Sequence, residues 1–260
     1  MFPDVYFIGL SLYAWCIVVG IIFAFLTFRL CAERMKLSVK LQNTVLVIGF
    51  ISIAIGFLFA ILFQAFYDYT ATGKFVIDNH TGMTFYGGLI GGAGTFLIGY
   101  FFVAPKICKE EVLLSVRPVV SAAACAIAIA HAFGRIGCFF AGCCYGKTTD
   151  SAIGIYLPAV QERVIPTQLI EAAFLFLLFA GLLVLLLKTK LNTLYFYMIL
   201  YGVFRFILEF WRADDRGSSV IPALSPSQVL SILLVIGGVG LLVFSRIIGR
   251  KRSAHDAKTE

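Results

Sequence analysis

One stretch of the sequence, residues 131–147, places charged and cysteine side chains inside apolar surroundings. It reads HAFGRIGCFFAGCCYGK and holds a histidine, an arginine (Arg135), three cysteines and four glycines. Arginine in lipid costs about 2.5–3.5 kcal/mol, so it persists there only beside a partner or in a wet cavity. So many glycines in a short stretch indicate that another part of the backbone comes close here, and they argue against a plain helix. We therefore take this stretch as the candidate active centre.

A second polar group follows at the end of a later apolar run, YGVFRFILEFWR, and consists of Tyr201, Arg205, Glu209 and Arg212. Spacings of four, four and three residues place these side chains on one helix face. They could be a structural glutamate–arginine pair that reaches to the membrane interface. They could also line a binding site for a phosphate group. One carboxylate cannot neutralise these two guanidiniums and that of Arg135, which favours the phosphate site.

A third group lies in IPTQLIEA, where Pro166 is at a favoured first-turn position of a helix. Gln168 and Glu171 share a helix face, and an acidic group there also suits the helix dipole. Two interpretations stay open. The group is a polar cluster at a helix start, or it supplies partners that hold Arg135 or Arg205.

Two further signals are weaker. The glycine pairs of YGGLIGG, residues 86–92, let another backbone come close in a membrane, so helix packing alone explains them. Tyr86, just before them, could point its hydroxyl into the same site. Tyr13 lies in an expected break between Ser11 and Trp15, where an aromatic residue of the membrane interface is the simplest interpretation.

The cysteines need their own interpretation. Cys138, Cys143 and Cys144 form the one cluster among seven cysteines. With His131, two helical turns before Cys138, they could make a Cys3His metal set. A vicinal pair is awkward for one ion and CxxC pairs are absent, so we expect no metal. A disulfide from Cys138 to a neighbour is possible on an oxidising face, and a free, packed set of thiols is the favoured alternative.

The elements that must position these residues are membrane spans. The chain is 60% hydrophobic and only 13% charged, with a mean hydropathy of +0.95, whereas a soluble domain has roughly 25% charged residues. Apolar runs of about 20 residues recur along the whole chain, which indicates a polytopic helical membrane protein. The net charge of +7 comes from short loops between these runs and not from a basic patch on a soluble module, so nucleic-acid binding is excluded.

We expect an all-α fold, a single integral membrane domain over residues 1–260, with seven transmembrane helices. The expected spans are 7–30, 45–66, 85–103, 118–133, 166–187, 193–210 and 225–248. The N-terminus lacks a basic region and a small-residue cleavage site, so the first span should not be a removable signal peptide. Most of the 21 lysines and arginines fall in alternate loops on one side. The positive-inside rule then predicts an outside N-terminus and a cytoplasmic C-terminus.

The opposite, outward side carries seven basic residues in this scheme: Lys74, Arg135, Lys147, Arg163, Arg205, Arg212 and Arg216. Topology does not require arginine there. Arg135, Arg205 and Arg212 therefore need a functional explanation.

Together, these motifs resemble the prolipoprotein diacylglyceryl transferase family over nearly the whole chain. The resemblance rests on Tyr13, GGLIGG at 87–92, Gly134-Arg135-Ile136-Gly137 with Phe139, Gly142 and Gly146, Pro166-Thr167-Gln168-Leu169 with Glu171, Tyr201-Gly202 with Arg205-Phe206 and Glu209-Phe210, and SPSQVLSI at 225–232. Each piece alone is weak, but six in order on seven spans are strong together.

The resemblance implies a multi-pass transferase of the bacterial inner membrane that acts in lipoprotein biosynthesis. The family moves the diacylglyceryl group of phosphatidylglycerol to the lipobox cysteine thiol of a prolipoprotein, and glycerol 1-phosphate leaves. The resemblance implies no cofactor and no metal. The predicted catalytic residues are Arg135, Arg205, Glu209 and Tyr86. The predicted substrate-binding residues are Tyr13, Gly87, Gly88, Gly142, Gly146, Gln168, Glu171, Tyr201 and Arg212.

This chain departs from the usual family pattern at polar positions. The family usually has histidine where this chain has Tyr86 and Ile165, and Asn, Asn and Glu where it has Cys138, Ala141 and Cys143. A phenol titrates near pH 10, so Tyr86 is a poor general base. Two alternatives follow. One is a divergent paralogue that acts on another phospholipid or acceptor, and the other is a non-catalytic phospholipid-binding or thiol-redox membrane protein.

Overall fold

A computed structural model of the protein describes residues 6–73, 75–77, 81–109, 111–158, 160–189, 191–213, 221 and 223–259, with side chains up to residue 247 except at 71. Within these ranges, seven helices are long and apolar enough to cross a membrane. The prediction of a helical fold with seven apolar spans is therefore confirmed. The orientation across the membrane stays a prediction. Of the outward basic residues in that prediction, Lys74 and Arg216 lie outside the described residues.

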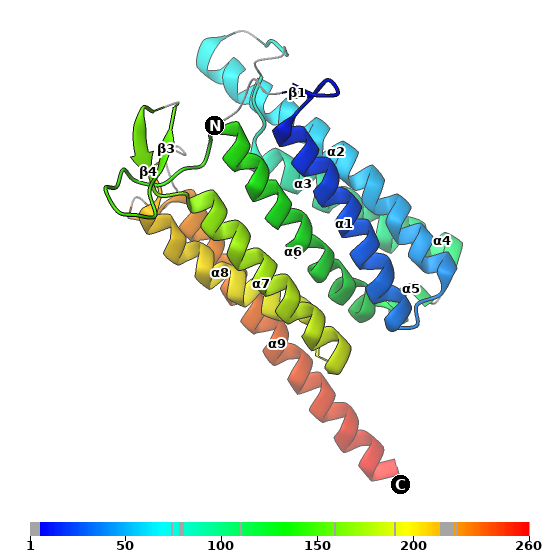
Figure 1. Cartoon of the computed structure of the whole chain (residues 1–260). Coiled ribbons are helices and arrows are strands. Elements are labelled where there is room, and N and C mark those ends of the chain that lie inside the picture. Colours follow the sequence, from blue (N-terminus) through cyan, green and yellow to red (C-terminus); the bar gives the residue numbers. More distant parts are fainter. Residues whose placement is uncertain are drawn as a thin grey trace. The chain divides into compact units, whose positions relative to one another are not determined.

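The chain forms two compact units. The first comprises Met1–Cys31 and Val119–Glu260, and the second comprises Ala32–Pro118. The expected single domain over 1–260 stays a prediction. The elements that contribute to the first unit are β1 (Tyr6–Phe7), β2 (Leu10–Ser11), α1 (Leu12–Arg34), α6 (Val116–Ala141), β3 (Ile155–Leu157), β4 (Glu162–Val164), α7 (Thr167–Lys188), α8 (Thr193–Leu208), the 3-10 helix η2 (Glu209–Trp211) and α9 (Pro226–Thr259). Figure 1 shows their course along the chain.

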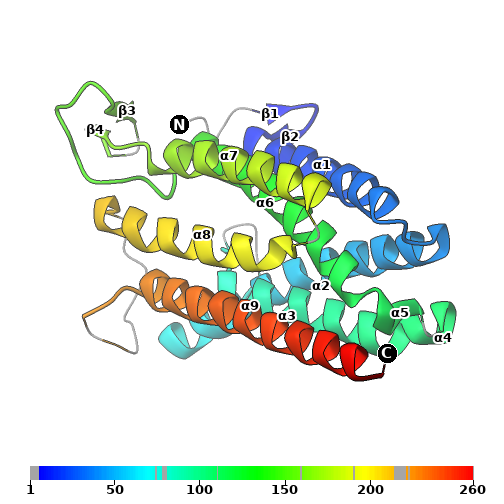
Figure 2. The same cartoon turned by 90° about the horizontal axis from the view of Figure 1, so that it is seen from below.

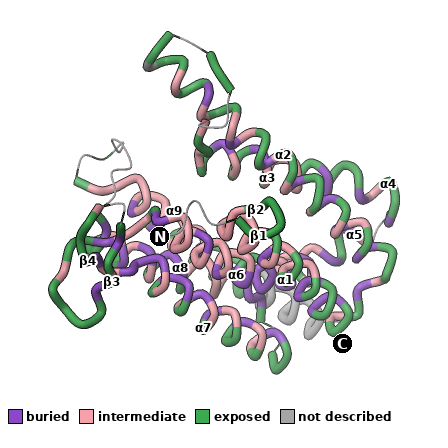
Figure 3. Tube along the Cα trace, turned by 45° about the horizontal axis from the view of Figure 1, so that its top comes forward, coloured by how far each residue is buried: buried purple, intermediate pink, exposed green. Residues whose placement is uncertain are grey.

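Helix α6 is the most buried span. In the most apolar 18-residue segment of α6, 50% of the residues are buried, whereas the corresponding share is 33% in α7, the next most buried span. Figure 3 colours each residue by its burial. Its alanine-rich sequence lets neighbouring helices approach closely. Against α1, the Cβ position of Gly20 lies 3.0 Å from Phe133 Cβ, and the rings of Phe23 and Phe133 stack at 5.2 Å.

Helices α7, α8 and α9 lie side by side (Figures 1 and 2). Between α7 and α8, the rings of Phe174 and Phe204 stack at 3.8 Å. Between α8 and α9, a Cβ added to Gly202 would lie 2.8 Å from Val235 Cγ2. Consecutive spans run in opposite directions. The C-terminal ends of α6 and α8 therefore meet the N-terminal ends of α7 and α9 at one end of this unit.

Two sequence predictions about local structure need correction. The expected break around Tyr13 is wrong, because α1 is helical from Leu12 onward and Tyr13 lies in its first turn. The expectation that residues 131–147 avoid a plain helix is wrong for their first part, because α6 continues to Ala141. Four helical turns of small and apolar residues precede this stretch, and helix propagation adds a hydrogen bond with each further residue.

The second unit contains α2 (Val39–Thr72), α3 (Phe85–Ile98), the π-helix η1 (Gly99–Val103), α4 (Ala104–Cys108) and α5 (Glu111–Leu114). The third span runs through α3, η1 and α4. Pro105 has no N–H to donate, and the backbone widens to π geometry just before it, with the Ala104 N–H bonded to the Gly99 carbonyl.

The glycine pairs at 87–92 pack α3 against α2, as the packing interpretation predicts. A Cβ at Gly87 would lie 2.5 Å from the Phe59 carbonyl oxygen, and one at Gly91 would lie 2.5 Å from Phe59 Cβ. On the partner helix, a Cβ at Gly56 would lie 3.2 Å from the Gly88 carbonyl oxygen. A Cβ at Gly87 or Gly91 would overlap Phe59, and one at Gly56 would press against the Gly88 carbonyl oxygen, so glycine permits this close approach of the two helices.

Candidate active site

The centre of the charged cluster in the first unit is Glu171, in the second turn of α7. Its side chain is completely buried. The Tyr201 hydroxyl donates a 2.8 Å hydrogen bond to its Oε1, and Arg135 Nε lies 3.1 Å from its Oε2. Of the two open interpretations of this residue, the one in which it holds an arginine is confirmed. A buried carboxylate needs such partners, because burial of an unpaired charge is very costly.

A second carboxylate, Glu209, holds Arg205. Arg205 Nη2 lies 2.7 Å from Glu209 Oε2, one helical turn away. The Ser225 hydroxyl donates to the other oxygen of Glu209 at 2.8 Å, and Arg205 Nη2 donates to Ser227 Oγ at 3.0 Å. The start of α9 therefore fixes the ion pair at the end of α8.

Arg212 completes the cluster between the two carboxylates. Its Nη1 lies 4.0 Å from Glu171 Oε2, and its Nε lies 4.0 Å from Glu209 Oε2. The side chains of the three arginines are 2–15% exposed. Three guanidiniums against two carboxylates leave one positive charge. A ligand group with one negative charge would neutralise this surplus positive charge.

Two buried polar atoms at this site have neither a hydrogen bond nor an ion-pair contact among the described residues. They are Nη1 of Arg205 and Oε1 of Gln168. Buried polar groups in native proteins are nearly always paired. A donor on Arg205 beside a surplus positive charge is therefore available to an oxygen atom of a ligand.

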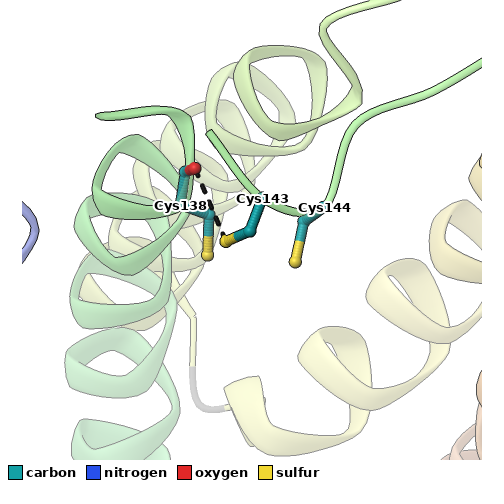
Figure 4. A group of neighbouring side chains, drawn as sticks. All are labelled: Cys138, Cys143 and Cys144. Carbon is teal, nitrogen blue, oxygen red and sulfur yellow. Dashed lines mark hydrogen bonds between the residues drawn. The ribbon is translucent and has the colours of Figure 1, made fainter. Parts of the chain in front are cut away.

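Helix α6 ends in a Schellman motif that turns the chain back on itself. Gly142 has φ +71°, and its N–H donates to Phe139 O at 3.1 Å. The Cys143 N–H donates to Cys138 O at 3.1 Å. This is the hydrogen-bond pattern that a left-handed glycine allows at a helix end. The turn brings Cys143 over Cys138, and Figure 4 shows the three cysteine side chains on the same side of the loop.

The loop is held by the first residues of α7. The Thr167 hydroxyl donates to Cys144 O at 2.8 Å, and Gln168 Nε2 donates to Cys143 O at 2.6 Å. Cys144 adopts φ +63°, which costs a non-glycine residue about 1–3 kcal/mol. These two side chains therefore compensate a strained backbone. Hydrogen bonds from Cys138 and Cys143, together with the Arg212 guanidinium, lower the pKa of the Cys144 thiol.

The remaining predicted residues of the first unit have packing contacts. A Cβ at Gly137 would lie 3.1 Å from the Tyr13 ring, so Tyr13 packs on α6 beside the candidate centre. A Cβ at Gly146 would lie 2.7 Å from the Trp211 carbonyl oxygen. Gly146 forms an isolated bridge to Arg212. It thereby ties the loop after α6 to the segment after α8.

The structure brings most predicted residues of the first unit together. They are Arg135, Gln168, Glu171, Tyr201, Arg205, Glu209 and Arg212. Tyr86, Gly87 and Gly88 belong to the second unit. Tyr86 is 46% exposed in the first turn of α3 and has an edge-to-face contact with Phe85. The catalytic and binding roles of all these residues stay predictions.

Sequence reasoning missed two serines as residues of the site. Ser225 and Ser227 contact Glu209 and Arg205. Their signal is the capping box S-x-x-Q, in which Ser225 and Gln228 bond each other's backbone N–H groups. His131 packs edge-to-face on the Tyr201 ring at 4.9 Å, with its Nε2 3.9 Å from Glu171 Oε1. Among the described residues, the group that could hold a metal therefore consists of the three cysteines without His131.

Comparison with known families agrees with the geometry. A family model described as "LGT: Prolipoprotein diacylglyceryl transferase" matches residues 3–244 of this chain. The chain belongs to the prolipoprotein diacylglyceryl transferase family.

Relatives in this family cover much or nearly all of the chain. The chain is 37% identical to phosphatidylglycerol–prolipoprotein diacylglyceryl transferase 2 of Clostridium perfringens over 187 residues, which are 68% of each protein. It is 38% identical to the transferase of Clostridium tetani over 186 residues, 66% of this chain and 70% of the relative. It is 30% identical to the transferase of Streptococcus pneumoniae strain JJA over 258 residues, 94% of this chain and 91% of the relative.

Proposed function

We propose that this transferase-family protein moves the diacylglyceryl group of phosphatidylglycerol to the lipobox cysteine of a prolipoprotein. The observation that carries the proposal is the cluster of three buried arginines against two glutamates. The surplus of one positive charge matches the single negative charge of a phosphodiester. The names of the relatives supply the two substrates.

The chemistry requires a site that favours growing charge on a phosphate. The acceptor thiol loses its proton, and its sulfur attacks the glyceryl carbon that carries the phosphate oxygen. The C–O bond breaks, and its electron pair stays on glycerol 1-phosphate, whose charge rises from −1 to −2. In this scheme Arg135 and Arg205 hold the phosphate, and fixed guanidiniums that meet developing charge lower the barrier.

The glutamates have a positioning role in this scheme. Glu171 holds Arg135 and Glu209 holds Arg205, each by a contact of 3.1 Å or less. Tyr201 and Ser225 hold the two carboxylates in turn. The guanidiniums are thus oriented before the lipid arrives, which saves reorganisation during the reaction.

The proposed setting is the bacterial inner membrane, with the N-terminus outside and the C-terminus in the cytoplasm. The charged cluster then lies in the outer half of the membrane, where the lysine-poor loops face. Phosphatidylglycerol would enter from the bilayer, and the signal peptide of the prolipoprotein would present its cysteine at the same level.

The test is complementation of a strain that lacks the transferase, with lipidation of a model lipoprotein read by mass spectrometry. The wild-type chain should restore the diacylglyceryl mass shift. Arg135→Ala and Arg205→Ala should lower the rate by about 100-fold or more, since charge-assisted contacts contribute about 1.5–3 kcal/mol each and two contacts are lost.

Arg34→Ala is the matched control, because Arg34 is an exposed arginine in the last turn of α1. It should retain the wild-type rate. Full lipidation by both Arg135→Ala and Arg205→Ala, at equal protein levels in the membrane, would contradict the proposal.

A further inference from the structure

The three thiols of Cys138, Cys143 and Cys144 form a cluster that the proposed transfer does not use. All three sulfur atoms lie within 4.8 Å of one another. None of the three forms a disulfide, and Cys143 is exposed. Four-coordinate zinc binds thiolate at about 2.3 Å, which corresponds to about 3.8 Å between its sulfur ligands. A movement of less than about 1 Å by each sulfur would produce that spacing.

The neighbouring positions of Cys143 and Cys144 do not prevent a shared ion. In an extended chain, adjacent side chains point to opposite sides. Here the positive φ of Cys144 turns its side chain to the same side as that of Cys143 (Figure 4). The expectation from the sequence that a vicinal pair is awkward for one metal therefore does not apply to this backbone.

The strained loop is held in place by side chains dedicated to it. Thr167 and Gln168 bond the carbonyl groups of Cys144 and Cys143, and the Schellman turn fixes Cys143 against Cys138. The thiols are thus placed by the backbone of two helix ends rather than by flexible side chains alone. Strain that is compensated in this way commonly marks a functional site.

The transfer reaction also needs a way to deprotonate the acceptor thiol. Only a few per cent of a free cysteine is thiolate at neutral pH. Among the described residues of the charged cluster, each carboxylate is already in an ion pair with arginine. A metal ion deprotonates the thiol that it binds, so the ion could replace a general base.

We propose that Cys138, Cys143 and Cys144 bind one Zn²⁺ whose fourth position takes the thiol of the acceptor cysteine. Three protein ligands with one open position are the pattern of catalytic zinc. This inference rests on the proposed function, because it names the means by which that reaction activates its nucleophile.

The acceptor thiol binds Zn²⁺ as a thiolate and releases its proton to solvent. The sulfur forms a bond to the glyceryl carbon, the carbon–oxygen bond to phosphate breaks, and the electron pair leaves with glycerol phosphate. The thioether product is uncharged and a weaker ligand than thiolate, so it leaves the ion. No oxidant or reductant takes part.

The position of the cluster suits this step. Cys138 lies three residues after Arg135 on α6, about one helical turn away. Cys144 is close enough to Arg212 to interact with its charge. The nucleophile on the metal would therefore stand beside the arginines that hold the phosphate.

Cobalt substitution tests the site by a signal other than activity. The full-length protein, purified in detergent under reducing conditions, is titrated with Co²⁺ and then with Zn²⁺. One Co²⁺ per chain should give a near-ultraviolet sulfur-to-cobalt charge-transfer band that Zn²⁺ abolishes. A lipobox peptide should then raise the absorbance of that band by about one third, because the number of thiolate ligands on cobalt rises from three to four. The same peptide with serine in place of cysteine should leave it unchanged.

The cysteine variants test the ligands. Cys138→Ser, Cys143→Ser and Cys144→Ser should each weaken Co²⁺ binding at least tenfold, while their size-exclusion profiles stay like that of wild type. Cys108→Ser is the matched control, since Cys108 is buried on α4 and lies 3.5 Å from the Thr44 hydroxyl. It should bind Co²⁺ like the wild type.

Three results on metal binding and thiol state would overturn the inference. They are a wild-type protein without the charge-transfer band, a band that the cysteine peptide leaves unchanged, and a disulfide between two of these cysteines in protein isolated from membranes. Full lipidation by the triple serine variant would also overturn it and leave the proposed function intact. A normal cobalt titration in a protein that transfers no lipid would instead refute the proposed function.

Discussion

At the scale of single residues, the buried carboxylate of Glu171 is the most informative side chain. It belongs to α7 and contacts Arg135 of α6 and Tyr201 of α8, so it connects three helices. A buried ion pair is weak support for stability in itself, but loss of one partner leaves an uncompensated charge. The pair is therefore best understood as a device that orients Arg135.

Glu171→Gln tests this role. The substitution keeps the shape and removes the charge, so three buried guanidiniums would face a single carboxylate. We expect a loss of about 3–5 kcal/mol in stability and loss of most transfer activity. Thermal unfolding in detergent and the lipoprotein mass shift measure the two effects.

Glu162→Gln provides the comparison, since Glu162 is exposed on β4. It should change stability by less than about 0.5 kcal/mol. An unfolding temperature of Glu171→Gln equal to that of wild type would show that Glu171 does not carry the charge assigned to it.

At the scale of elements, glycines decide where helices can touch. In α3, the Cβ position of Gly87 is only 2.5 Å from the Phe59 carbonyl oxygen, whereas that of Gly94 has no atom within 4 Å. Both residues lie in the same helix. The difference between them comes from the partner helix α2 and not from helix propensity.

Alanine at these two positions should therefore act in opposite directions. Gly87→Ala should lower stability by about 1–3 kcal/mol, as overpacking does. Gly94→Ala should be neutral or should stabilise by up to about 1 kcal/mol, because alanine is the better helix former. Thermal unfolding of the two purified variants measures this, and equal losses in both would refute the close packing of α2 and α3.

The α6 end and the α7 start form the other informative pair of elements. The PTQL motif holds the cysteine loop through Thr167 and Gln168, and Glu171 one turn later holds Arg135. One helix start therefore positions both the thiols and an arginine of the candidate site.

At the scale of the whole molecule, seven spans and alternating basic loops predict the orientation in the membrane. Green fluorescent protein fused at the C-terminus should fluoresce, and alkaline phosphatase fused there should be inactive. Alkaline phosphatase fused after residue 158, between β3 and β4, should be active. The reverse pattern would place the charged cluster on the cytoplasmic side and contradict the proposed access to lipoprotein signal peptides.

Much of this architecture follows from the sequence by itself. Long apolar runs must become helices in a membrane, since each backbone polar group needs an internal partner. That rule determined the seven spans and their approximate ends. Residue spacing on one helix also predicted the face that carries Tyr201, Arg205 and Glu209, because helical periodicity is local.

Tertiary structure decided which groups from different helices meet. The pairing of Glu171 with Arg135, the serines at the start of α9 and the packing of His131 on Tyr201 all join residues far apart in the chain. No periodicity encodes such contacts, because they depend on how antiparallel helices pack. The cysteine cluster is a second arrangement that the sequence pattern does not encode. Its sequence argued against a shared ion, and only the left-handed backbone at Cys144 brought the three sulfurs to one side.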